Sequence, residues 1–307
     1  MLRLKKIPTL SAGSLLRFYH KKILWLLALL LLASGAGAAD IVLAFSEAHA
    51  PSASLDGAAR IQLITGQLQR MGVPPGVVLV RTGERHHKNL HWLDRWMAAA
   101  YLPVNHGHHF HLLGRPDTRW RSADVHRASR QLMSLPGWRQ HIYLPGVDTA
   151  SLVKARRWNP LAVSLRLDTG QLDLLYRQNS HRFRQLAMDA LQQDVLAELL
   201  QPLQAMVLAR QGIDPHAPLV LQLSADDVTA YLLPGLVDGL LEKGFRLVTA
   251  DRLFLPPVSA SPLADLRQPD RYLAALLSLP QKRTAYPPVV DTASLVTDPA
   301  RYGFNSR

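Results

Sequence analysis

The sequence contains no cysteine among its 307 residues. A chain without thiols cannot form a disulfide framework, a cysteine-ligated zinc site, an iron–sulfur cluster or a thiol nucleophile. Charged residues make up only 19% of the chain and aromatic residues 7%, against 48% hydrophobic residues. This balance excludes a disordered chain and fits one large domain with a well-filled core. The sequence also lacks an internal repeat of about 20–50 residues, which argues against a solenoid or a propeller.

Acidic residues are missing from the first 39 positions, which hold six basic residues and so half of the net charge of +12. Two lysines precede an apolar run, residues 23–33, and Ala36 and Ala38 follow it at the spacing that signal peptidase requires. The run is shorter than the roughly 20 residues that span a bilayer comfortably. We therefore expect residues 1–39 to be a signal peptide or a signal anchor, and the remainder to be exported to a bacterial periplasm or cell envelope, with anchoring to the inner membrane if the segment is retained.

Basic residues beyond this segment are scattered along the chain. A nucleic-acid-binding protein presents a basic stripe or patch with aromatic residues among the cations. We therefore expect no nucleic-acid partner, and contact with a membrane only through the N-terminal segment.

Short apolar runs alternate with longer segments of helical periodicity from residue 40 onward. Because strands that alternate with helices form a parallel sheet covered by helices, the pattern predicts an α/β domain. The predicted strands are 40–45, 77–80, 101–104, 162–167, 219–223 and 246–249. The predicted helices are 56–71, 86–100, 122–134, 182–210 and 226–243. Residues 256–307 are rich in proline and predict a C-terminal extension with one helix at 270–279.

Four stretches of the sequence carry a family resemblance. They are Ile41–Ala48, residues 61–80, Pro103–Leu112 and residues 218–251, which include Lys243-Gly-Phe-Arg-Leu-Val-Thr249. Together they resemble the polysaccharide deacetylase family, the NodB-homology domain, over residues 40–255. The resemblance implies a distorted (β/α) barrel with fewer than eight strands. Functional residues of such barrels lie at the C-terminal ends of the strands.

The family removes an acetyl group from an N-acetylated sugar, with a divalent metal held by one aspartate and two histidines. By resemblance the metal would be zinc, cobalt or nickel. The position of the family's catalytic base is Ser46 here, and the position of its metal-binding aspartate is Glu47. The resemblance therefore implies that Glu47 is a metal ligand or a replacement base, with His49 as a further possible ligand. The alternative is an ordinary polar turn at the end of a strand.

The second motif falls in Asn105-His-Gly-His-His-Phe-His111. The family places two histidines four residues apart, but His106 is followed at that spacing by Phe110. Three other pairs remain open: His106 with His111, His108 with His111, and Asn105 with His109. Histidine is a common metal ligand, so His106, His109 and His111 are predicted metal ligands beside Glu47. An exposed polar loop is the alternative.

The later motifs depart further from the family. Pro145-Gly146 keeps a turn without the family's arginine, and the family's leaving-group acid, a histidine, falls at Leu223 or Ser224. Asp168 resembles a later family aspartate, but its place before a helix favours an N-cap.

Three hypotheses follow from the sequence. The chain is a working deacetylase of an N- or O-acetylated envelope or extracellular glycan, or an inactive pseudoenzyme that binds such a glycan or acts as a scaffold, or a periplasmic metal-binding protein that uses the histidine loop. Its partner is a polysaccharide or an acetylated oligosaccharide in the first two cases.

Overall fold

The computed structural model describes the chain in several ranges, and every structural statement below concerns them. They are residues 39–46, 55–83, 91–108, 118–135, 138, 141–143, 159–161, 163–179, 188–211, 216–253, 288–297 and 299–302. The predicted signal segment, Glu47, His49, the loop from residue 109 to 117, Pro145-Gly146 and the predicted helix 270–279 lie outside these ranges.

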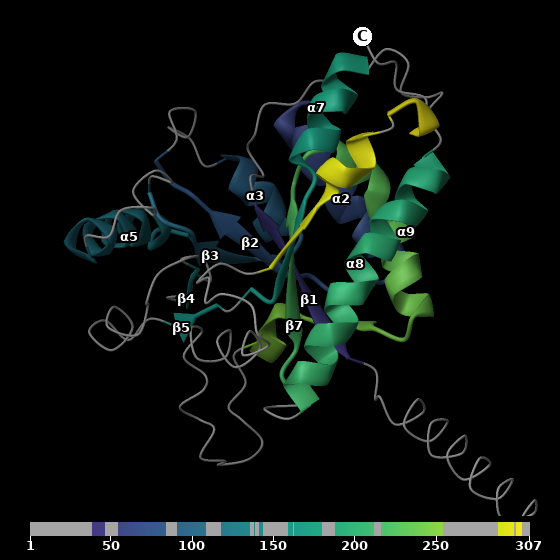
Figure 1. The fold of residues 1–307 in the computed structure, drawn as a ribbon. Coiled ribbons are helices and arrows are strands. Elements are labelled where there is room, and N and C mark those ends of the chain that lie inside the picture. Colours follow the sequence, from purple (N-terminus) through teal and green to yellow (C-terminus); the bar gives the residue numbers. More distant parts are fainter. Residues whose placement is uncertain are drawn as a thin grey trace, which may run out of the picture. The chain divides into compact units, whose positions relative to one another are not determined.

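A sheet of nine strands forms the centre of the domain (Figure 1). Its strand order is β5-β4-β3-β2-β1-β7-β6-β9, with β8 also paired to β1, and each pair is parallel. The strands are β1 (Asp40–Ser46), β2 (Val77–Val80), β3 (Leu102–Asn105), β4 (His141–Ile142), β5 (Asn159–Pro160), β6 (Leu165–Asp168), β7 (Leu219–Ser224), β8 (Arg246–Leu247) and β9 (Val289–Asp291).

Both faces of the central strands are buried, as a parallel sheet requires. All seven residues of β1 are buried. Ile41, Leu43 and Phe45 pack into a large cluster with helical residues, whereas Val42 and Ala44 pack into a smaller cluster built from strand and loop residues. Because side chains alternate along a strand, each strand has one face toward the helices and one toward the interior of the curved sheet.

The helices cover the outer face of the sheet. They are α2 (Gly57–Arg70), α3 (His91–Ala98), α5 (Thr118–Leu132), α7 (Gly170–Asn179), α8 (Met188–Gln211) and α9 (Asp227–Glu242). Asp56 and Asp226 cap α2 and α9, since their carboxylates accept from the backbone N–H of Ala59 and Thr229. Figure 1 shows α8 and α9 side by side next to β1 and β7, where they pack together.

An aromatic cluster packs α3 against the sheet. The ring of Trp96 lies 5.1 Å from that of Phe45 and 4.8 Å from that of Tyr101. Burial raises the pKa of the Tyr101 hydroxyl well above its usual range.

Part of the proline-containing C-terminal extension belongs to the sheet. Strand β9 pairs with β6, and short 3-10 helices follow at Thr292–Thr297 and Pro299–Tyr302. Thr292 Oγ1 donates to the carbonyl of Asp168, and Tyr302 Oη donates to Asp194 of α8. Residues 288–297 and 299–302 therefore pack along β6 and α8.

The predicted α/β class and parallel sheet are confirmed. The resemblance implied fewer than eight strands. Three of the nine observed strands have only two residues each, and the remaining six agree with that number. Among the described strands the path ends at β5 and β9, so the barrel is open.

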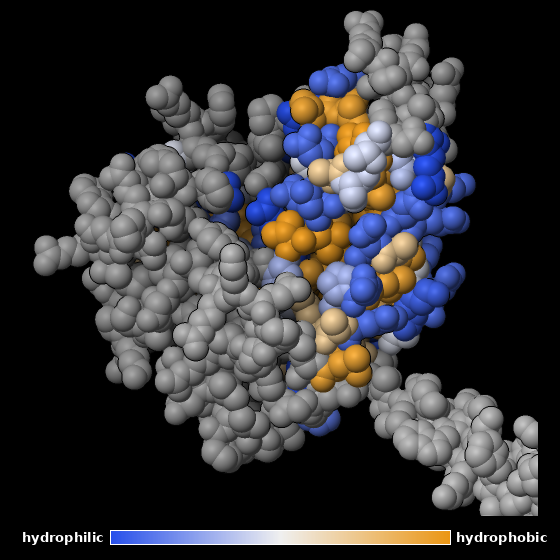
Figure 2. All heavy atoms as spheres, viewed as in Figure 1, coloured by the Kyte–Doolittle hydropathy of each residue, from blue (hydrophilic) through white to orange (hydrophobic). Residues whose placement is uncertain are grey.

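Figure 2 shows hydrophilic and apolar side chains interspersed over α7, α8 and α9. Within the described ranges, every helix is too short or too polar to cross a bilayer.

Candidate functional site

A polar layer lies on the interior face of the sheet, where the strands end. Val42, Val77, Leu79, Val104 and Val220 form an apolar floor on this face. The two-residue period of each strand then places Ser46, Arg81, His106, Gln222 and Ser224 above the floor. Because all the strands are parallel, these side chains share one edge of the sheet, the edge that carries the site in barrels of this kind.

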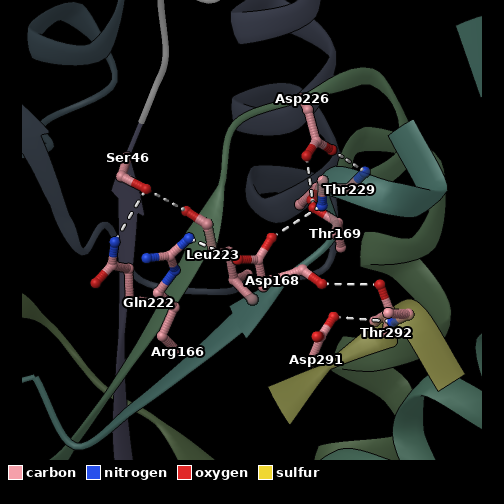
Figure 3. A network of polar contacts seen from close by, with 12 residues as sticks. Ser46, Arg166, Asp168, Thr169, Gln222, Leu223, Asp226, Thr229, Asp291 and Thr292 are labelled. Atoms are coloured by element: carbon pink, nitrogen blue, oxygen red, sulfur yellow. Dashed lines mark hydrogen bonds and ion pairs between the residues drawn. The ribbon is translucent and has the colours of Figure 1, made fainter. Parts of the chain in front are cut away.

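Two serines meet at the centre of this edge. Ser46 of β1 is the register partner of Ser224 of β7. Ser46 Oγ accepts from Gln222 Nε2 over 3.1 Å and donates to the Leu223 carbonyl over 3.4 Å (Figure 3). The other end of the Gln222 amide, Oε1, is buried and has no hydrogen-bond partner among the described residues. A buried acceptor left in this state can take a hydrogen bond from a ligand.

The neighbouring strand β6 adds a charged pair. Arg166, the register partner of Gln222, contacts Asp168 over 2.7 Å, and both side chains are about one-third exposed at 34%. Asp168 Oδ1 also accepts from the backbone N–H of Gly170, where α7 begins. Asp168 was predicted to be an N-cap, but the first carbonyl of the helix is that of Thr169, which accepts from the Asp173 N–H, so Asp168 lies one residue before the N-cap.

His106 lies at the end of β3 and is 2% exposed. Its Nδ1 is 3.0 Å from the Tyr143 carbonyl, its ring stacks on the Tyr143 ring at 5.1 Å, and its Nε2 is 3.1 Å from Nη2 of Arg81. His108 follows two residues later. Its Nδ1 lies 2.8 Å from Thr82 Oγ1, and its backbone N–H donates to Asp124 over 2.7 Å. These contacts fix the start of the histidine loop against β2 and α5.

Buried carboxyl groups lie behind this edge, at the N-terminal ends of the outer helices. Asp226 accepts from Thr169 Oγ1 over 2.5 Å and from the Thr229 backbone over 2.7 Å. Burial, with a smaller contribution from the nearby Asp173 charge, raises the pKa of Asp226 to about 7. Burial also raises the pKa of Asp173, although Arg177 opposes the shift. The fully buried Arg60 contacts Asp227 over 3.5 Å in the same region.

Of the four predicted site residues, His106 alone falls in the described ranges, and it lies at the expected edge. Glu47, His109 and His111 lie outside those ranges, so their roles stay predictions. Sequence reasoning missed Arg81 and Gln222. The two-residue period could have found both, since Arg81 continues Val77 and Leu79, and Gln222 continues Val220.

The metal implied by the resemblance does not fit the described residues. Both ring nitrogens of His106 are engaged, one of them by a permanent cation. Within the described ranges, three His, Asp or Glu side chains do not come together as a metal-binding group. A deprotonated ring nitrogen is required for metal binding.

Comparisons with known proteins give similarity of fold. A scan against protein-family models and a search of curated proteins both found no match. Among solved structures, the Xyl-CE4 domain of a multidomain xylanase from the hindgut metagenome of Trinervitermes trinervoides is 14% identical, with 73% of this chain and 96% of that chain covered and a TM-score of 0.45.

Two further solved structures are similar at the same level. The peptidoglycan deacetylase PdaC from Bacillus subtilis is 13% identical over 71% of this chain and 91% of its own, with a TM-score of 0.46. A CE4 family pseudoenzyme from Bacillus anthracis is 11% identical over 71% and 66%, with a TM-score of 0.44. These structures are what the chain is similar to, and identities of 11–14% carry no activity over to it.

Proposed function

We propose that this chain is an exported glycan-binding protein with a polysaccharide-deacetylase-like fold that does not hydrolyse its ligand. The pairing of Ser46 with Ser224 carries the proposal. These serines stand where the resemblance calls for a general base and, in one of two alignments, for the leaving-group acid. General acid–base catalysis needs groups that titrate near the working pH, and a serine hydroxyl does not.

The same groups suit recognition of a sugar. Hydroxyl and amide groups of Ser46, Ser224 and Gln222 can exchange hydrogen bonds with sugar hydroxyl and acetamido groups. The buried Oε1 of Gln222 supplies a specific acceptor. Leaving such a group unsatisfied costs about 1–3 kcal/mol, and a ligand donor would recover part of this energy. We therefore propose an acetylated polysaccharide or oligosaccharide as the ligand.

The test combines binding with turnover, using the full chain. Titration calorimetry would measure the affinity for a soluble N-acetylglucosamine oligomer and for an O-acetylated xylo-oligosaccharide. Acetate release would be followed with and without added zinc, cobalt or nickel. We expect saturable binding of at least one glycan and no acetate above the rate without protein. Metal-dependent acetate release that is lost in Glu47→Ala would overturn the proposal and support a working deacetylase.

A matched pair of variants locates the binding site. Gln222→Met keeps the side-chain volume but removes the buried acceptor, and we expect about a tenfold weaker glycan affinity, equivalent to roughly 1.4 kcal/mol. Gln69→Met makes the same change on the exposed face of α2 and should leave the affinity unchanged. Equal affinities for both variants would contradict this site. Tight metal binding without any glycan affinity would favour the metal-binding alternative.

A further inference from the structure

The tautomer of His106 is fixed by its first neighbour. The carbonyl oxygen of Tyr143, 3.0 Å from Nδ1, can only accept a hydrogen bond. Nδ1 must therefore carry the ring proton. Stacking on the Tyr143 ring and an exposure of only 2% hold the imidazole in this orientation.

The second neighbour takes the remaining lone pair of His106. The guanidinium of Arg81 can only donate, and its Nη2 lies 3.1 Å from Nε2. A protonated Nε2 would point its N–H at another N–H, so Nε2 must accept. A neutral ring with its proton on Nδ1 is the one form that satisfies both contacts. A metal ion that binds Nε2 would need the lone pair that Arg81 occupies.

The chain next to Arg81 is tied to the loop that carries His106. The residue after it, Thr82, donates from its backbone N–H to the Gly107 carbonyl over 3.2 Å and contacts His108 Nδ1 through its hydroxyl over 2.8 Å. These contacts join the end of β2 to the loop that carries His106. Arg81 itself is only 9% exposed, so its charge is fixed inside the site.

We propose that Arg81 is the resident cation of this site, and that its guanidinium takes the place at His106 that a divalent metal would occupy. Any metal that approached Nε2 would have to displace a permanent positive charge as well as break a hydrogen bond. The inference is independent of the proposed glycan, since it concerns the protonation and metal affinity of the unliganded chain.

The first measurement is the tautomer of His106 in the full chain. Nitrogen–proton correlation spectra of ¹⁵N-histidine-labelled protein distinguish the two ring nitrogens, and His106→Gln identifies the resonance. We expect a neutral ring with its proton on Nδ1. A proton on Nε2, or on both nitrogens, at neutral pH would overturn the proposal. This result comes from the unmodified chain and does not depend on the folding of any variant at Arg81.

The second measurement is a zinc titration of the same protein after treatment with chelator. We expect the His106 nitrogen resonances to stay in place with a molar excess of zinc. In Arg81→Met, which keeps a side chain of similar length without charge, they should shift as zinc binds. Arg130→Met removes an exposed arginine of α5 and serves as the control. Zinc-dependent shifts in the unmodified chain, or no shift in a folded Arg81→Met, would overturn the proposal.

Discussion

Thr169 donates a 2.5 Å hydrogen bond to Asp226, and this contact joins the ends of β6 and β7 behind the polar layer. Thr169 follows the last residue of β6, and Asp226 lies two residues after the end of β7, directly before α9. Asp226 also accepts from the Thr229 backbone as the N-cap of α9. A single buried carboxyl group therefore sets the spacing of two strand ends and the start of a helix.

This carboxyl group predicts how stability depends on pH. The folded-state pKa of Asp226, about 7, lies above the ordinary value of 3.8, so the folded chain binds the proton more tightly. The stability that comes from this tighter proton binding is fully present below about pH 4 and is lost as the pH rises through 7. In Asp226→Asn we expect a flatter pH profile of the free energy of unfolding. At pH 8 the variant should be more stable by up to about 4 kcal/mol, less any loss from the Thr169 contact.

Chemical denaturation between pH 4 and 8 measures this effect. Asparagine remains a good N-cap, so the start of α9 should be preserved. Asp238→Asn removes an exposed carboxylate from the same helix and should leave the profile unchanged. If Asp226→Asn kept the full pH slope of the unmodified chain, another group would have to carry it.

The sequence predicted the elements of the sheet better than the contacts of the site. The apolar run Val77–Val80 and the periodicity of residues 226–243 are long enough to predict β2 and α9 closely. Strands β4 and β5 have two residues each and present too little pattern to be found. Strand β9 was missed because it lies in a proline-rich stretch, and its pairing with β6 joins residues far apart in the chain.

The contacts within the polar layer were also out of reach of the sequence patterns. The dense histidine loop drew attention to His106, but its partner Arg81 lies 25 residues earlier in the chain. A sequence pattern indicates which side chains share a face, whereas the tautomer of a histidine depends on the atoms around it. The likeness to deacetylases predicted a metal ligand at His106, whereas the contact between its Nε2 and Arg81 appears only in the structure.

The close approach of β1 and β2 predicts a strong effect of a single methyl group. A Cβ atom on Gly76 would collide with the backbone carbonyl of Leu43, and backbone cannot move aside as a side chain can. We expect Gly76→Ala to lower the free energy of unfolding by about 1–3 kcal/mol, or more if the strands separate. Gly57→Ala, in open space at the start of α2, should be neutral or slightly stabilising. Equal stabilities in urea denaturation would contradict this geometry.

The pairing of β9 with β6 predicts that the C-terminal extension stabilises the domain. Strand β9 covers the outer edge of β6, and the backbone N–H of Arg166 donates to the Pro288 carbonyl. A chain that ends at residue 287 should unfold at a lower temperature by several degrees, since it loses this pairing and the Tyr302–Asp194 contact. A chain that ends at residue 302 keeps both and is the control. Identical melting temperatures for the two truncated chains would show that residues 288–302 add no stability.

The buried pair of Arg60 and Asp227 predicts a strong energetic coupling between two side chains. Its side chain is fully buried and lies 3.5 Å from the equally buried Asp227, with Asp173 close enough for the Arg60 charge to lower the pKa of that carboxyl group. Arg60→Met should cost about 3–5 kcal/mol, because it leaves carboxylates buried without this cation. Asp227→Asn should also destabilise, since it leaves the guanidinium buried beside a neutral amide.

The double variant separates pairing from packing. With both charges removed, neither member of the pair is left buried without the other, so Arg60→Met with Asp227→Asn should cost clearly less than the two single changes added together. Urea denaturation at pH 7 would give the four free energies of this cycle. We expect a coupling energy above about 1 kcal/mol, well beyond the value for exposed ion pairs. Strict additivity would mean that Arg60 stabilises the domain through its packing and through the other carboxyl groups, with no direct contribution from Asp227.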